Sequence, residues 1–177
     1  IELFVARVPA VNEHGRPDPL FVLAGGPGLA ATTFYTGVAP VFSRIHRDRD
    51  IVLVDQRGTG ASNALTCPGS FDPDAPESTA ALTQEARSCL ASLATHANVA
   101  DYTTSLAVRD LDAVRAALHY DAINLYGGSY GTRVAQQYLR RYPQHTRAVI
   151  LDGVVPPQMT LGASLALDVQ RALQRIF

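Results

Sequence analysis

The sequence has no hydrophobic run long enough to span a bilayer and almost no net charge, and each absence excludes a class of protein. A transmembrane helix needs about 20 consecutive apolar residues, and no such stretch occurs in the chain. The formal net charge is −1, and the arginines are scattered rather than clustered. We therefore expect neither a membrane nor a nucleic acid as a partner.

Cysteine is scarce, with Cys67 and Cys89 the two in the chain. Their spacing fits no zinc motif, and no pair of histidines completes a ligand set, so we expect no metal. Cys67 lies in a loop rich in proline and aspartate, and Cys89 lies in a helical pattern beyond it. From these positions alone, one disulfide and two separate buried thiols are equally compatible with the sequence.

An initiator methionine and a signal peptide are also missing. The chain opens directly in a strand-like run, Ile1–Val8, so we expect it to be a processed or trimmed piece of a longer protein. Hydrophobic residues make up 47% of the 177 residues and charged residues 18%, which is typical of one folded, soluble domain with a sizeable core.

The most informative stretch is Ile123–Thr132, where a short apolar run ends in Gly-Gly-Ser-Tyr-Gly and a helical pattern follows at once. Gly-x-Ser-x-Gly between a strand and a helix is typical of a nucleophile elbow. The turn is so tight that the residues flanking the serine can carry almost no side chain. We predict that Ser129 is a nucleophile in a strained conformation. The backbone N–H of Tyr130 should face the same space and donate to a developing oxyanion.

A second glycine-rich loop follows the apolar run Leu20–Leu23, which is typical of a strand buried on both faces of a parallel sheet. The loop, Gly25–Gly28, is no phosphate-binding P-loop, because Leu29-Ala30 stand where Lys and Ser/Thr would be needed. It can instead bring a second backbone N–H toward the substrate. Since Pro27 has no N–H, Gly26 or Gly28 must supply it.

The remaining pattern alternates strands with helices and predicts a parallel sheet. The loops at Gly25, Asp55 and Ser129 all follow strands, and sites in open α/β sheets lie at that edge. We expect Asp55 and Arg57 to pair with each other or with neighbouring loops, and not to act in catalysis. Further strands are expected at 51–54 and 148–151, and helices at 35–45, 83–97, 104–118, 132–142 and 161–176.

Three motifs, Gly25–Gly28, Asp55–Ser62 and Gly127–Thr132, together resemble the proline iminopeptidases of the α/β-hydrolase family. Gly-Gly-Ser-Tyr-Gly-Thr-Arg and Leu-Asp-Gly-Val-Val-Pro-Pro are closer to the secreted tripeptidyl aminopeptidases of that family. The resemblance implies that Ser129 attacks a peptide or ester carbonyl and that Gly26 and Tyr130 form the oxyanion hole.

The same resemblance implies a disulfide between Cys67 and Cys89 and a secreted or cell-envelope location, although a cytoplasmic one stays open. One departure is Ala24, which stands where the family often has histidine. A larger departure concerns the catalytic Asp and His. In these enzymes both follow a cap domain, and the resemblance to this chain stops where that cap would begin. We therefore expect a partial α/β-hydrolase fold: residues 1–160 as the N-terminal part of the core and 161–177 as a helix at the start of a missing cap.

The five histidines offer no obvious general base. His14, His46, His96 and His119 precede the serine in the chain. His145 follows it at the far end of a helix roughly 15 Å or more long. Each histidine is expected to be a solvated surface residue. Asp152 could be a catalytic acid, but with no histidine to orient, a structural hydrogen bond to its loop is the better interpretation.

These observations predict a serine hydrolase that removes amino-terminal residues from peptides through an acyl-enzyme, without metal or organic cofactor. The chain by itself should not be a competent hydrolase, because its base is missing. Residues 148–151 should form a bare sheet edge through which the chain can self-associate. The alternatives are an esterase or amidase of small esters and amides on the same scaffold, and a catalytically silent fragment that binds or associates.

Overall fold

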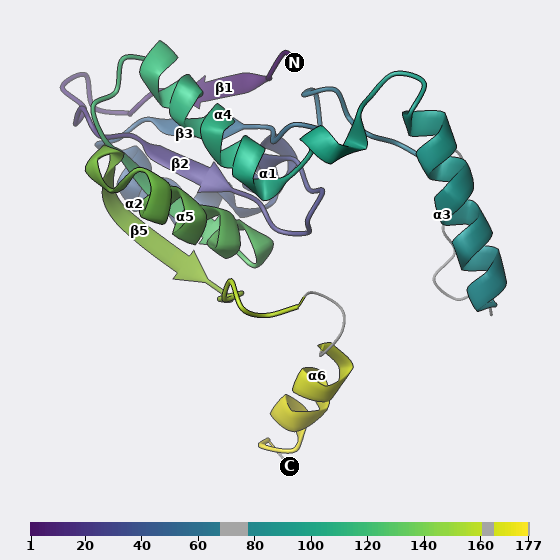
Figure 1. Ribbon diagram of the computed structural model, residues 1–177. Coiled ribbons are helices and arrows are strands. Elements are labelled where there is room, and N and C mark those ends of the chain that lie inside the picture. The colour runs from purple at the N-terminus through teal and green to yellow at the C-terminus, as the bar shows by residue number, and fades with distance from the viewer. Residues whose placement is uncertain (68–77, 161–164, 177) are drawn as a thin grey trace.

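A five-stranded sheet forms the centre of the computed structural model, which describes residues 1–67, 78–160 and 165–176 (Figure 1). The strand order is β1-β3-β2-β4-β5, and β1 alone runs antiparallel to its neighbour, β3. The predicted α/β class with a mostly parallel sheet is therefore confirmed. The strands are β1 (Val5–Val8), β2 (Leu20–Leu23), β3 (Ile51–Val54), β4 (Ile123–Gly128) and β5 (Thr146–Asp152).

The helices differ from the sequence expectation mainly at their ends. The helix expected over 35–45 is three short pieces that begin at Ala31, because Pro40 interrupts the regular hydrogen bonding. The helix expected over 83–97 begins earlier, since Ser78 caps it by accepting the Ala81 N–H at 3.2 Å. The helices are α1 (Ala31–Val38), α2 (Ser43–His46), α3 (Thr79–Leu93), α4 (Thr104–Ala117), α5 (Tyr130–Arg141) and α6 (Leu165–Leu173), with 3-10 turns at Ala39–Phe42, Val99–Asp101 and Pro143–His145.

Apolar side chains cover both faces of the central strands. Because side chains alternate along a strand, Phe21 and Leu23 pack on the face covered by α4 and α5, while Leu20 and Val22 pack on the opposite face with Phe42. All four residues of β2, like all four of β3, are buried. The unbroken apolar runs therefore correspond to strands buried on both faces, and the loops at Gly25 and Asp55 follow their carboxyl ends.

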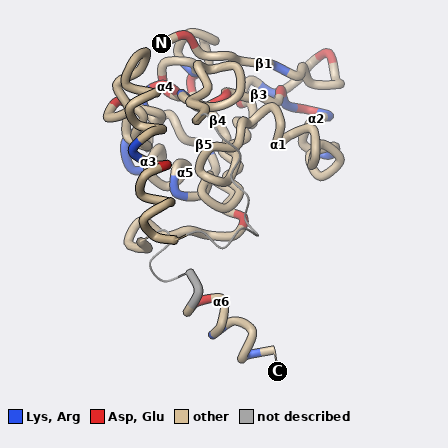
Figure 2. Tube along the Cα trace, turned by 90° about the vertical axis from the view of Figure 1, so that its right-hand side faces the viewer, with Lys and Arg blue, Asp and Glu red and all other residues tan. Residues whose placement is uncertain are grey.

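Strand β5 forms one edge of the described sheet, and it is the least buried strand. Ile150 and Leu151 remain 46% and 36% exposed. Helices α3 and α6 stand away from the sheet (Figure 1). Part of the helix expected over 161–176 lies outside the described residues. Acidic and basic residues are interspersed along the trace (Figure 2), and no described helix has both the length and the apolar character needed to cross a membrane.

Cys67 and Cys89 are joined by a disulfide, with their Cα atoms 5.0 Å apart. This separation lies within the range that a disulfide spans without backbone movement. The bond connects the loop after β3 with the last part of α3. The disulfide therefore links α3, which has little contact with the sheet, covalently to the loop after β3.

Candidate active site

Ser129 lies at a sharp turn between β4 and α5, and its backbone is strained. Its φ and ψ are 53° and −118°, and the residue is exposed. An L-residue rarely adopts this conformation, and such strain is found mostly at functional sites. A Cβ atom at Gly127 would lie 2.4 Å from the Gly131 carbonyl oxygen, and one at Gly131 would lie 2.3 Å from that of Leu23. Both glycines are therefore required by close backbone approach.

Three hydrogen bonds hold the turn. The Ser129 N–H donates to the carbonyl oxygen of Asp152 at 2.8 Å. The Ser129 carbonyl oxygen accepts from the Thr132 N–H at 2.9 Å and from the Thr132 hydroxyl at 2.7 Å. Both polar groups of the serine backbone are thus satisfied inside the fold, and the side chain is left without a protein partner among the described residues. That leaves its hydroxyl available for a ligand.

The Gly25–Gly28 loop packs directly against the serine. A Cβ at Gly25 would lie 3.2 Å from Ser129 Cβ and 3.7 Å from Ser129 Oγ. Gly26 has a φ of +104° and Tyr130 is the first residue of α5, and neither N–H donates a hydrogen bond to a described residue. The phenol of Tyr130 is anchored 2.6 Å from the Thr104 hydroxyl. Two N–H groups near the serine are therefore unpaired, one of them at the electropositive end of a helix.

An open hollow of about 340 Å³ lies beside Ser129. Its other wall is mainly apolar and aromatic. The rings of Phe34 and Tyr126 stack with centroids 6.3 Å apart, and the buried ring of Phe42, which does not itself line the hollow, packs edge-on against Tyr126 at 4.9 Å. The lining residues are Gly25, Leu29, Phe34, Val38, Tyr126, Gly128, Ser129, Asp152 and Gly153.

Asp152 is the charged residue of this lining. Its carbonyl oxygen accepts from Ser129, as described, and its carboxylate accepts from the Tyr126 phenol at 2.6 Å. Burial, together with the hydrogen bond to Asp152, raises the pKa of Tyr126 to about 12, so the phenol remains a donor at neutral pH. The expected hydrogen bond between the Asp152 carboxylate and its own loop is absent from the described residues. The carboxylate is instead bonded to Tyr126 on the neighbouring strand, β4.

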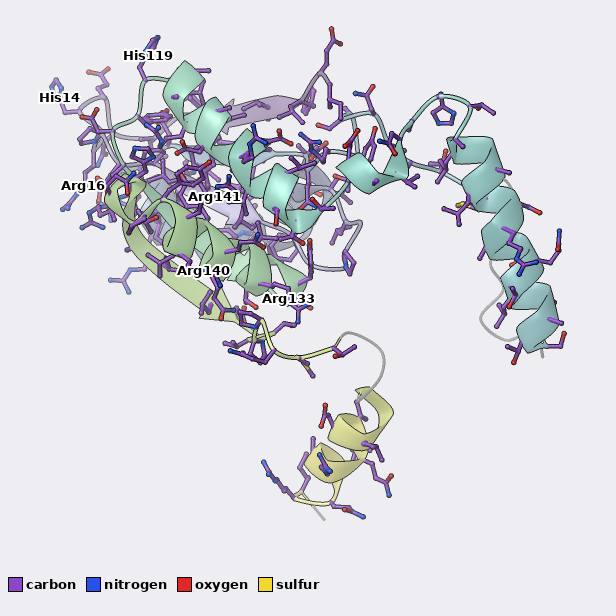
Figure 3. The ribbon with its side chains drawn as sticks, viewed as in Figure 1. His14, Arg16, His119, Arg133, Arg140 and Arg141 are labelled. Carbon is purple, nitrogen blue, oxygen red and sulfur yellow. A yellow bond between two sulfur atoms is a disulfide. The ribbon has the colours of Figure 1, made fainter. Side chains whose placement is uncertain are left out.

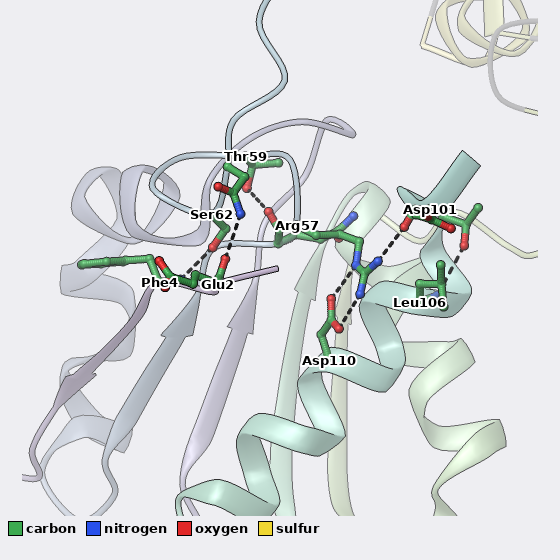
Figure 4. A network of polar contacts seen from close by, with 11 residues as sticks. Glu2, Phe4, Arg57, Thr59, Ser62, Asp101, Leu106 and Asp110 are labelled. Carbon is green, nitrogen blue, oxygen red and sulfur yellow. Dashed lines mark hydrogen bonds and ion pairs between the residues drawn. The ribbon is translucent and has the colours of Figure 1, made fainter. Parts of the chain in front are cut away.

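Asp55 and Arg57 brace the loops around the site and do not pair with each other. Asp55 is 1% exposed and accepts hydrogen bonds from Thr32 on α1 and from the N–H of Ala61. Arg57 forms a two-pronged ion pair with Asp110 on α4, at 2.6 and 2.7 Å, as Figure 4 shows. The expected pairing with each other is therefore absent, and of the expected loop contacts Asp55 makes one with Ala61, while the carboxylate partner of Arg57 lies on helix α4 and not on a loop.

None of the five histidines lines the hollow. His14 and His119 lie at the end of the sheet where β2 and β5 begin (Figure 3), and they are exposed as expected. The expectation is wrong for His145, which is half-buried with Nδ1 2.7 Å from an Asp112 carboxylate oxygen. Nor is His46 fully solvated, since its Nε2 lies 2.8 Å from the Pro9 carbonyl oxygen. No cluster that could hold a metal ion is present among the described residues.

Sequence reasoning missed two features. One is the aromatic wall of the hollow. The sequence did offer a signal for it, because Tyr126 stands two residues before Gly128, and a strand places residues two apart on the same face. The other is the network around Asp112 on α4, which also joins Arg115 and Tyr138. A lone aspartate in a helical pattern carries no signal of a partner on another helix.

The fold and the serine turn define a class, and the sequence comparison agrees with it. Residues 18–175 match the family described as alpha/beta hydrolase fold, and the chain belongs to that family. It is 32% identical over 171 residues to the serine protease Hip1 of Mycobacterium tuberculosis, covering 88% of this chain and 32% of that protein. It is 30% identical over 176 residues to a tripeptidyl aminopeptidase of Streptomyces lividans, covering 89% and 32%.

A third relative, carboxylesterase B of Mycobacterium tuberculosis, is 37% identical over 176 residues, covering 90% of this chain and 33% of that protein. The chain thus spans about a third of the length of these relatives. Among solved structures, a proline iminopeptidase-related protein of Thermus thermophilus has a TM-score of 0.53 and 27% identity, with 84% of this chain and 39% of that one covered. The predicted family resemblance is confirmed.

Proposed function

We propose that this chain carries the nucleophile and the oxyanion hole of a serine peptidase that removes residues from the amino terminus of peptides. The observation that carries the proposal is the strained, exposed Ser129 beside two unpaired N–H groups. A hydroxyl in this position can attack a carbonyl carbon. The N–H groups of Gly26 and Tyr130 can donate hydrogen bonds to the carbonyl oxygen and so stabilise the negative charge that develops on it.

In the proposed reaction, Ser129 Oγ bonds to the substrate carbonyl carbon while a general base takes the hydroxyl proton. The tetrahedral intermediate then collapses, the amine leaves with that proton, and an acyl-enzyme remains. Water, deprotonated by the same base, releases the amino-terminal fragment and restores the serine. Because no histidine of residues 1–177 lines the hollow, we propose that the base lies outside these residues.

The choice of peptides as substrates is supported by the relatives named as a serine protease and a tripeptidyl aminopeptidase. The relative named carboxylesterase B supports a second candidate, hydrolysis of small esters on the same scaffold. The disulfide supports a secreted or cell-envelope location, since such bonds persist in oxidising compartments.

A substrate panel on the full-length protein tests the proposal. It contains aminoacyl and tripeptidyl p-nitroanilides with free amino termini, the same compounds N-acetylated, and p-nitrophenyl acetate. A peptidase should release nitroaniline, whereas an esterase should act on the acetate alone. Ser129→Ala should abolish whichever activity is found, and exposed Ser43→Ala is the matched control. Turnover that survives Ser129→Ala would refute Ser129 as the nucleophile.

A further inference from the structure

The carboxylate of Asp152 lies on the wall of the hollow that also contains the serine. In the β4–β5 pairing, Asp152 stands opposite Gly128 and Ile150 stands opposite Tyr126. Side chains two residues apart on a strand share a face, and facing residues of paired strands do as well. This register places the carboxylate beside Tyr126, and the 2.8 Å bond from the Ser129 N–H to the Asp152 carbonyl joins the two backbones.

One carboxylate oxygen of Asp152 has a partner and the other has none. Oδ2 accepts the Tyr126 phenol at 2.6 Å, while Oδ1 has no hydrogen bond to a described residue. Asp152 also makes no ion pair with any described residue. The phenol therefore fixes the direction of the carboxylate and leaves one acceptor oxygen for a ligand.

The rest of the lining carries no compensating charge, because no arginine or histidine contributes to the described wall. Phe34, Val38 and Leu29 supply an apolar surface instead. A single negative charge on an otherwise uncharged and mainly apolar wall beside the nucleophile favours a ligand with a cationic group and an apolar part.

We propose that Asp152 binds the cationic nitrogen of the substrate residue whose carbonyl Ser129 attacks, and that the hollow receives the side chain of that residue. This inference rests on the proposed function and names its substrate class. In an amino-terminal residue, one carbon atom separates the protonated α-amino group from the carbonyl carbon, so its binding group must adjoin the nucleophile. Tyr126 acts as a positioning residue through its hydrogen bond to the carboxylate.

The test compares matched substrates with the full-length protein and its Asp152→Asn variant. The substrates are alanyl-p-nitroanilide, N-acetylalanyl-p-nitroanilide and N-acetyl-lysyl-p-nitroanilide. The third places the cation on the side chain and so separates the two possible sources of the charge. Asn keeps the size of the side chain and the backbone bond to Ser129. Asp121→Asn, at an exposed aspartate before β4, is the matched control.

We expect Asp152→Asn to lower kcat/KM for the free-amine substrate by about tenfold or more, because a charge-assisted hydrogen bond is lost. The effect should fall mainly on KM, with N-acetylalanyl turnover and the labelling of Ser129 by a fluorophosphonate unchanged. Tyr126→Phe should produce a smaller loss of the same kind. If the loss falls on N-acetyl-lysyl turnover instead, the α-amino assignment is overturned.

Equal loss on all three substrates would overturn the inference as well, since that is the behaviour of a catalytic acid or of a damaged fold. No change in any of them would also overturn it. In both cases a wild-type enzyme that cleaves alanyl-p-nitroanilide leaves the proposed function intact. If the wild-type protein cleaves none of the three and Ser129 resists the fluorophosphonate, the proposed function fails first.

Discussion

Ser129 has a backbone conformation that costs an L-residue of order 1–3 kcal/mol, and the surrounding contacts hold it there. The hydrogen bonds from Ser129 to Asp152 and from Thr132 to Ser129 fix both sides of the turn. The pattern Gly-x-Ser-x-Gly predicted this geometry because only glycine fits where strand, helix and loop backbones nearly touch. The partners of the turn could not be predicted, since Asp152 reaches it through a backbone carbonyl, which any residue has.

Gly131→Ala should destabilise the protein, because its Cβ would lie 2.3 Å from the Leu23 carbonyl oxygen and the backbones would have to separate. We expect a loss of about 1–3 kcal/mol in the free energy of unfolding, the usual cost of overpacking. The matched control is Gly37→Ala in α1, where a Cβ meets nothing within 4 Å. The control should be neutral or stabilising by up to about 1 kcal/mol. Urea denaturation measures both, and equal effects of the two changes would contradict the packing account.

At the scale of elements, the sequence predicted β2 and β3 to the residue and placed β4 and α5 correctly, because continuous apolar runs and the glycine pattern are local signals. It placed α1 and α3 less well, because Pro40 and the Ser78 cap decide where these helices begin and end. It predicted nothing of the contacts between α4 and α5. Those contacts join residues far apart in the chain, which periodicity cannot pair.

Asp112 links these two helices and is expected to make stability depend on pH. It accepts hydrogen bonds from Arg115 and the Tyr138 phenol and lies 2.7 Å from His145. Burial raises the pKa of the Asp112 carboxyl, but these hydrogen bonds outweigh it and hold the pKa below its ordinary value. Because the pKa is lowered in the folded state, the ionised carboxylate adds to the free energy of unfolding at pH values above the unfolded pKa of about 3.9. This added stability is lost as the pH falls below about 3.9 toward the lowered pKa of the folded state.

Asp112→Asn should therefore destabilise the protein by about 2 kcal/mol above about pH 5 and by progressively less toward about pH 2. Urea denaturation across this range measures the difference from wild type. Asp121→Asn, at an exposed aspartate, should show no such pH-dependent difference. A difference for Asp112→Asn that stays constant down to about pH 2 would mean that the charge of the carboxylate is not what stabilises the contact.

The disulfide between Cys67 and Cys89 gives a second prediction at this scale. The residues are 22 apart in sequence. Closing a loop of this size should stabilise the fold by about 3 kcal/mol in the chain-entropy model. Thiol titration of the denatured, unreduced protein should find neither cysteine reactive, and reduction should make both reactive. Two reactive thiols before reduction would exclude the bond.

At the scale of the whole molecule, the order of the three motifs along the chain was enough to predict the fold. The parallel sheet brings the carboxyl ends of β2 and β4 together, and with them Gly25 and Ser129. The hollow beside Ser129 was not predictable, because its wall comes from α1, β4 and β5 at once.

The exposed edge of β5 leads to a prediction about the 177-residue chain by itself. Because Ile150 and Leu151 are partly exposed on this edge, we expect the isolated chain to associate with itself. Ile150→Arg should shift it toward the monomer in sedimentation experiments. A wild-type chain that stays monomeric at high concentration would show that the edge is adequately protected.

The most direct test of the account is whether Ser129 reacts as a nucleophile. A fluorophosphonate should label the full-length protein, and trypsin should then release residues 116–133, in which Ser129 is the sole serine. We expect mass spectrometry to find the adduct on that serine and to find none after Ser129→Ala. By contrast, the 177-residue chain alone should label slowly and should not turn over aminoacyl substrates, since a serine without a base is a poor nucleophile. Labelling of the full-length protein at another residue, or ordinary enzymatic turnover by the 177-residue chain alone, would contradict the account.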